Sequence, residues 1–122
     1  MAESYDLSVK EAAASIRDGR LSAVELMESV VSRSKDLEPT LRVWVTLDED
    51  VAMEAAARSD TELEHRGPSG PLHGVPLGVK DIFYTNGVRT TGGSSIFADF
   101  VPAYDATAVA LLKRAGAIVM GK

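Results

Sequence analysis

Glycine and proline are distributed unevenly along this 122-residue chain, and this distribution limits where regular helices can form. Nine of the ten glycines and four of the five prolines follow residue 66. Both residue types interrupt helices and favour tight turns. We therefore expect residues 1–66 to be helical and residues 67–122 to contain strands, turns and a crossover helix. Candidate functional residues are expected in this second part, because binding and catalytic groups concentrate on connecting segments.

The charged residues follow the same division. Residues 1–66 carry 15 Asp and Glu against 8 Lys and Arg, whereas residues 67–122 carry 3 against 5. The formal net charge of −5 argues against nucleic-acid binding, which needs a basic surface. The absence of cysteine excludes disulfides and thiol nucleophiles, and two histidines, His65 and His73, are too few for a histidine-rich metal site. We therefore expect no metal and no cofactor, and a small molecule or another protein as partner.

The ends of the chain and the length of its apolar runs bear on its cellular location and on whether it is a piece of a longer protein. No apolar run approaches the roughly 20 residues that a membrane-spanning helix needs. The first residues lack the basic and apolar regions of a secretory signal, so a cytoplasmic protein without membrane contact is expected. The chain stops two residues after an apolar stretch, where a complete domain would usually end in polar, frayed residues. We therefore expect a piece of a longer protein.

Two capping boxes predict the first two helices. In SVKE (8–11) and SAVE (22–25), serine and glutamate satisfy the free amides at a helix start. Gly19 is expected to end the first helix and Pro39 the second, whose apolar face recurs at helical spacing. The β-branched and aromatic segment Val43–Leu47 predicts a strand. Asp48 is expected to cap an alanine-rich third helix that continues to about Glu64.

A strand, a helix and a second strand are predicted in residues 67–122. The first strand is expected over Val75–Ile82, followed by a turn at Thr85–Gly87. The helix is expected to be capped by Asp105 and to continue to Arg114, and the second strand is expected over Ala117–Met120. A strand, helix and strand in this order predict a parallel crossover and an α/β fold.

Lys80 is an unusual residue in the first predicted strand, within GVPLGVKDIF (74–83). Strand alternation places Lys80 on the same face as Pro76 and Gly78, whose small size would leave space beside the amine, and places Asp81 on the other face. Burial lowers the pKa of a lysine because it disfavours the charged form, and a neutral amine can act as a general base. The alternative is an edge-strand lysine that prevents unwanted strand pairing.

Two other motifs suggest chemistry less strongly. GGSS (92–95) could expose a serine nucleophile, but it lacks the order of a nucleophile elbow, so a turn in which serine caps the next segment is favoured. GAIVMGK (116–122) matches the first seven positions of a phosphate-binding loop. Its four middle residues favour a strand rather than a loop, so this pattern does not favour a nucleotide site.

Four parts of the chain together resemble the N-terminal portion of the amidase signature family. They are the leading helix pair, GPLHGVPLGVKD (70–81), TNGVRTTGGSS (85–95) and YDATAVALLKRAGAIVMGK (104–122). They occur in the family's order and cover essentially the whole chain. The resemblance implies an α/β fold in which helices pack on a mixed central sheet that is incomplete in this chain. It also implies that residues 1–122 are an N-terminal fragment of an amidase-signature domain.

The resemblance also implies a reaction. In this family the lysine that matches Lys80 belongs to a Ser-cisSer-Lys triad, so the implied activity is the cleavage of carboxylic amides with Lys80 as general base. The family's two triad serines lie downstream of residue 122, and Ser94 and Ser95 match its TTxGS turn instead. We therefore expect this chain to be inactive alone. Its expected partners are a small-molecule amide and the remainder of the enzyme, as a covalent continuation or a separate chain.

Two other interpretations remain open. The chain is also similar to the A subunit of a glutamine-dependent aminoacyl-tRNA amidotransferase, the one case in which a nucleic-acid partner is expected. Alternatively, it is a non-catalytic binding or structural module that retains the scaffold. A homo-oligomer is compatible with each interpretation.

Overall fold

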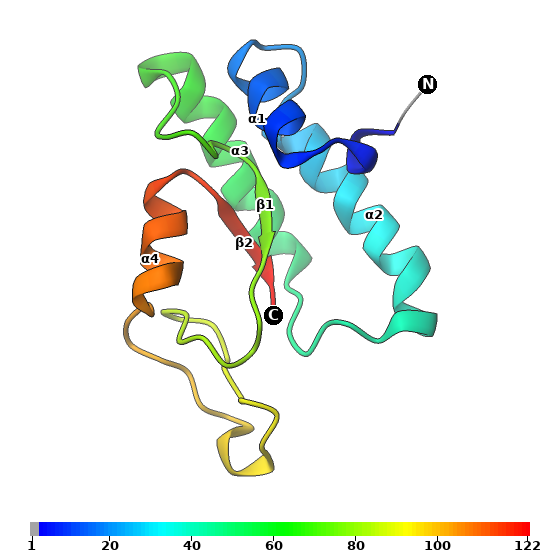
Figure 1. Cartoon of the computed structure of the whole chain (residues 1–122), viewed down its shortest axis with the longest axis vertical. Helices are drawn as coiled ribbons and strands as arrows, with labels where there is room; N and C mark the ends of the chain where they lie inside the picture. Colours follow the sequence, from blue (N-terminus) through cyan, green and yellow to red (C-terminus); the bar gives the residue numbers. More distant parts are fainter. Residues whose placement is uncertain (1–2) are drawn as a thin grey trace.

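A computed structural model describes residues 3–122 of the chain, with helices that precede a small parallel sheet (Figure 1). In Figure 1 the two strands run between helix α4 on the left and helix α2 on the right. No helix among the described residues is long and apolar enough to cross a membrane. The elements in order are η1 Ser4–Asp6, α1 Val9–Arg17, α2 Ala23–Leu41, α3 Glu49–Arg66, β1 Pro76–Gly78, η2 Ser95–Phe97, α4 Thr107–Arg114 and β2 Ile118–Gly121.

The predicted helix starts are confirmed for the first three α-helices. Ser8 and Ser22 form complete capping boxes with Glu11 and Glu25, and the Asp48 carboxylate accepts a hydrogen bond from the Val51 amide. These local hydrogen bonds satisfy amides that have no partner inside a helix. The Glu11 and Glu25 carboxyl groups accept hydrogen bonds from Ser8 and Ser22. These hydrogen bonds favour the ionised form and therefore lower the pKa of both carboxyl groups.

The prediction that the second helix ends at Pro39 is wrong, because α2 continues through Pro39 to Leu41. Proline removes only one donor from the helix, and the chain leaves the helix at Arg42, which adopts a left-handed conformation with φ of 49°. The Glu38 carboxylate accepts hydrogen bonds from the amides of Val43 and Trp44 at 3.1 and 3.0 Å. The exit from the helix is therefore fixed by Glu38 rather than by the proline.

The parallel crossover is confirmed, but the first strand is shorter than predicted. β1 pairs in parallel with β2, and α4 lies in the connection between them. β1 ends at Gly78 rather than Ile82, because Asp81 is drawn into a turn: its carbonyl accepts the Gly92 amide at 2.8 Å and its carboxylate accepts the Thr91 amide. Leu77 pairs with Val119, whereas Gly78 pairs with Gly121, so the register shifts by one residue on β2 between these two pairs.

Two further predicted features differ from the structure. The segment 43–47 is not a strand; only Leu47 makes an isolated antiparallel bridge, to Gly121. Asp105 does not cap α4, whose N-cap is Ala106 without a side-chain hydrogen bond. The Asp105 carboxylate instead accepts hydrogen bonds from the Asn86 amide at 2.7 Å and from Lys113 Nζ at 2.9 Å. It therefore joins the long loop to the last turn of α4.

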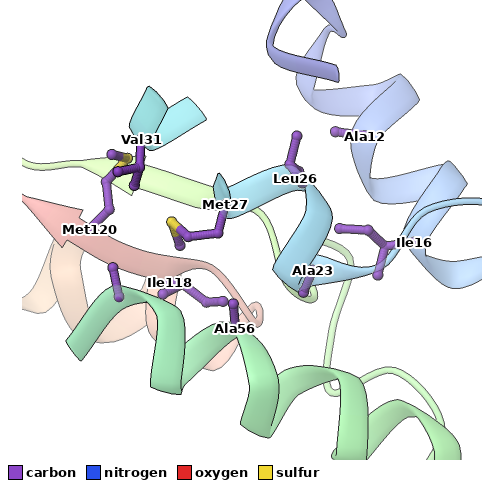
Figure 2. Close-up of a cluster of buried hydrophobic side chains, with 10 residues drawn as sticks. Ala12, Ile16, Ala23, Leu26, Met27, Val31, Ala56, Ile118 and Met120 are labelled. Carbon is purple, nitrogen blue, oxygen red and sulfur yellow. The ribbon is translucent and has the colours of Figure 1, made fainter. Parts of the chain in front are cut away.

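The main hydrophobic core lies where α1, α2, α3 and β2 meet (Figure 2). Ile16 and Met27 are completely buried, and Figure 2 shows Met27 pointing toward β2 and α3. Small side chains at Ala52 and Ala56 allow α3 to approach α2 and β2 closely. The Asp60 carboxylate of α3 also accepts hydrogen bonds from the first two amides of α2. The buried members are Ala12, Ile16, Ala23, Leu26, Met27, Val31, Ala52, Ala56, Ile118 and Met120.

Candidate active site

Lys80 lies two residues beyond the carboxyl end of β1, at the start of a tight turn. The Val79 amide donates to the Gly121 carbonyl at 3.0 Å, and the Phe83 amide donates to the Lys80 carbonyl at 3.1 Å. Ligands of open α/β sheets bind at the carboxyl ends of the strands, so this is a favourable place for a reactive group. The Lys80 side chain itself is exposed.

The expectation that Lys80 lies among apolar residues of a sheet is wrong for this chain. The strand ends before Lys80, and the space expected over Gly78 is occupied by Trp44. A Cβ atom at Gly78 would lie 3.1 Å from the Trp44 ring, and one at Gly121 would lie 2.8 Å from it. The two paired glycines therefore leave room for the Trp44 indole, and they do not leave an open space for Lys80.

Asp81 contacts groups other than its neighbour Lys80. Its carboxylate accepts hydrogen bonds from the amide and the hydroxyl of Thr91, and the Thr91 hydroxyl in turn accepts the Gly93 amide at 3.1 Å. Asp81 Oδ1 also lies 3.9 Å from Lys122 Nζ. The carboxylate therefore orders the turn that follows Lys80.

Lys122 is the functional candidate that the sequence reasoning missed. It is only 4% exposed. It directly follows β2, and because the two strands are parallel it lies at the same edge of the sheet as Lys80, which follows β1. Burial lowers the pKa of the Lys122 amine, and the Asp81 carboxylate partly opposes that shift. The sequence signal for Lys122 is the GK pair at the end of GAIVMGK. Comparison of this pattern with a phosphate-binding loop does not indicate a buried lysine. Three of its four middle residues do lie in a strand, Ile118–Gly121.

The serines and histidines near the glycine-rich turns have structural contacts. Ser94 caps η2 by accepting the Ile96 amide at 3.3 Å, which supports the predicted serine cap. His73 is buried and bonds to Ser69 and to the Ser59 carbonyl, so it attaches the loop before β1 to α3. His65 bonds to a carbonyl of its own helix. Residues 3–122 contain no group of three or more His, Asp or Glu side chains that could hold a metal ion.

A small hollow lies beside the Lys80 turn. It is bordered by aromatic and aliphatic side chains and by the backbone that contacts Asp81. Tyr84 packs against Phe100 and Tyr104, with ring centroids 5.3 Å apart in each pair. A larger surface hollow lies elsewhere, along α3 near Arg58 and Arg66. The residues around the small hollow are Ile82, Tyr84, Thr90, Thr91, Gly92, Phe97 and Phe100.

Comparison with known proteins identifies the family. The A subunit of the glutamyl-tRNA(Gln) amidotransferase from Myxococcus xanthus is 44% identical over 117 residues, which is 96% of this chain and 24% of that protein. A solved fatty acid amide hydrolase superposes over 100% of this chain and 22% of its own, with a TM-score of 0.93 and 25% identity. The peptide amidase of Stenotrophomonas maltophilia superposes over 96% of this chain and 24% of its own, with a TM-score of 0.86 and 33% identity.

These relatives are much longer than the 122 residues of this chain, which spans about a quarter of their length. The matches nevertheless cover nearly all of this chain, including both strands and the turn that contains Lys80. A family model described as Amidase matches residues 25–122. The chain therefore belongs to the amidase family.

Proposed function

We propose that this chain supplies Lys80 as the general base of an amidohydrolase that cleaves carboxylic amides, and that the serines of the reaction come from polypeptide beyond residue 122. The observation that carries the proposal is the position of Lys80 in a member of the amidase family: an exposed amine at the carboxyl end of a parallel strand, between two residues with fixed backbone contacts. The chain's coverage of about a quarter of its relatives is consistent with a partial catalytic domain.

The proposed reaction proceeds by acyl transfer. A neutral Lys80 amine takes a proton from a bridging serine, which takes the proton of the nucleophilic serine as that oxygen attacks the amide carbonyl. The carbon–nitrogen bond breaks, and the leaving amine receives a proton from the same relay. Water then attacks the acyl-serine ester, its proton returns through the relay, and the carboxylic acid and free enzyme are released.

A neutral lysine requires shielding from water, which the described residues do not provide at Lys80. Large apolar side chains next to this turn are exposed, among them Ile82 and Phe83, as are Ile96 and Phe97 on the same loop. Monomeric proteins rarely leave such side chains grouped on their surface without a function. We propose that the continuation of the chain covers this region, shields Lys80 and brings the serines to it.

Replacement of Lys80 in the complete gene product tests the base role. Lys80→Ala is expected to lower the rate of amide hydrolysis about 10²- to 10⁴-fold, the usual contribution of a general base. Lys10→Ala, which removes an exposed lysine on α1, is the matched control and should retain full activity. Release of ammonia or carboxylate from simple amides measures the rate. Full activity of Lys80→Ala, or amide hydrolysis by residues 1–122 alone, would overturn the proposal.

A second candidate function is supported by the 44% identity to the A subunit of an amidotransferase. In that case glutamine is the amide substrate, and its hydrolysis should rise when partner subunits and tRNA are added. Hydrolysis of simple amides that is unaffected by these additions favours the stand-alone amidohydrolase. If neither activity occurs in the complete gene product and Lys80→Ala changes no measured property, the chain is a non-catalytic module.

A further inference from the structure

Lys122 is the one Lys, Arg, Asp or Glu within residues 3–122 that is buried. Its side chain has no exposed surface, whereas Lys80 is exposed. Burying an amine without partners is costly, so the groups around it indicate its role. The backbone of Lys122 is equally fixed, because its amide donates to the Thr46 carbonyl at 2.8 Å and its carbonyl accepts the Val45 amide at 2.7 Å.

The contacts of Lys122 Nζ require it to donate hydrogen bonds. Nζ lies 2.5 Å from the Phe83 carbonyl, which can only accept, and it also bonds to Thr90 Oγ1. The Thr90 hydroxyl donates its own proton to the Val88 carbonyl at 3.0 Å, so its oxygen accepts from Lys122. The Asp81 carboxylate lies 3.9 Å away. An ammonium with three N–H donors fits this set of acceptors.

These acceptors enclose the turn that starts at Lys80. Phe83 and Asp81 lie within three residues of Lys80, and Thr90 lies on the segment that returns beside the turn. The Gly92 amide donates to the Asp81 carbonyl, and the Val79 amide donates to the carbonyl that precedes Lys122. The backbone before Lys80 is therefore held by β2, and the backbone after it is held by the side chain of Lys122.

We propose that Lys122 is a positioning residue for the reaction: its amine connects the Phe83 carbonyl to the Thr90 hydroxyl beside Asp81 and thereby fixes the turn that carries Lys80. This inference rests on the proposed function, because it assigns Lys122 a role in aiming the Lys80 amine. Small displacements of a reacting group have large effects, and a shift of about 1 Å can cost about 100-fold in rate. Lys122 itself transfers no proton in this scheme.

Two substitutions in the complete gene product test this role. Lys122→Met keeps the length of the side chain and removes all of its donors, and it should lower kcat at least about tenfold while KM changes less than about twofold. Thr90→Val removes one acceptor while Lys122 remains, and it should cause a smaller loss of kcat. Thr90→Ser is the matched control for Thr90→Val, because it keeps the hydroxyl oxygen, and it should retain nearly full activity.

Hydrogen exchange provides a readout that a general loss of stability would not give. In Lys122→Met, exchange should become faster at the Phe83 and Gly92 amides, whose acceptors are the carbonyls of Lys80 and Asp81. The amides of α1, α2 and α3 should keep their rates. Ile16→Ala, a core variant away from the turn, should lower the melting temperature without lowering kcat at temperatures where it remains folded.

Lys80→Ala, made in parallel, separates the two proposals. If Lys80→Ala is inactive but Lys122→Met and Thr90→Val keep their kcat and their exchange rates at the turn, the positioning role is overturned and the base role stands. If Lys80→Ala remains active, both are overturned. If Lys122→Met does not fold, Thr90→Val decides the question: an unchanged kcat and unchanged exchange at Phe83 and Gly92 would overturn the positioning role.

Discussion

The helical region, residues 8–66, and the loop after Lys80, residues 81–106, are held in different ways. The helices bury apolar side chains against each other and begin with capping groups three residues apart in sequence. The loop leaves several aromatic and aliphatic side chains exposed, and polar groups from distant parts of the chain order its start. The Lys122 amine and the Phe83 carbonyl, for example, are 39 residues apart in sequence.

This difference separates stability from the geometry of the candidate site. Apolar burial is non-directional and determines whether the chain folds at all. Hydrogen bonds to a buried charge are directional, and they determine where the Lys80 turn lies relative to β2. A substitution in the helical core should therefore change the stability of the whole chain, whereas a substitution among the polar groups should change the loop more than the helices.

The largest effect on stability is expected for Met27→Ala in the helical core. Met27 is completely buried between α2, α3 and β2, and its truncation should lower the free energy of unfolding by about 2–5 kcal/mol. Urea denaturation of the chain measures this change. Val9→Ala, at an exposed position on α1, is the control and should shift the value by less than about 0.5 kcal/mol. Equal shifts for the two variants would contradict the central role of this core.

A smaller and more local effect is expected for Asp81→Asn. The substitution keeps the shape of the side chain but removes the negative charge near Lys122 and one acceptor for Thr91. We expect the free energy of unfolding to fall by about 1–3 kcal/mol, because the buried Thr91 loses a hydrogen-bond acceptor. Asp99→Asn, at an exposed position on the same loop, should be nearly neutral.

Hydrogen exchange distinguishes Asp81→Asn from a change in the core. The amides of Thr91 and Gly92 should exchange faster, since they donate to the side chain and the backbone of Asp81. The exchange rates of the helix amides should rise only as far as the loss of global stability requires. If exchange accelerates uniformly along the chain, the loop and the helices unfold as one unit and the comparison between them fails.

The same difference explains how much could be predicted from the sequence. Ser8, Ser22 and Asp48 carry their partners within three residues, so the helix starts could be predicted from the sequence. The parallel crossover followed from the order of the elements and from rules that hold for most sheets. The end of α2 could not be predicted from Pro39, because the Glu38 side chain fixes the exit by turning back on amides that follow the helix.

The candidate site was predicted less completely. Lys80 was found because a lysine in an apolar run is unusual and because its context resembles a family motif; its catalytic role stays a prediction. Its exposure was not predicted, because the end of β1 depends on contacts of Asp81 with Thr91 and Gly92, ten or more residues away. Lys122 was missed for the same reason: its partners lie more than 30 residues earlier, and no local pattern connects them.

The smallest effect is expected at the far end of the loop, where Asp105 responds to pH. Burial tends to raise the pKa of this carboxyl group, but hydrogen bonds from the Asn86 amide and from Lys113 outweigh it, so the pKa lies below the ordinary value of 3.8. A carboxyl group with a lowered folded-state pKa stabilises the fold above its unfolded value, and this contribution is lost as the pH falls through the folded value. The stabilisation should therefore be nearly complete at pH 5 and should decline as the pH falls below about 4.

Comparison with Asp105→Asn isolates this carboxyl group from the others that titrate in the same range. The asparagine oxygen can still accept the Asn86 amide, but it cannot attract the charge of Lys113. The stability difference between the wild type and Asp105→Asn, measured from urea midpoints, should be larger at pH 5 than at pH 3. A difference that stays constant over this range would mean that Asp105 orders the loop through its hydrogen-bond geometry alone. The charge of Asp105 would then contribute nothing to the stability of the loop. The loop would in that respect resemble the helices, whose positions are set by apolar packing rather than by charge.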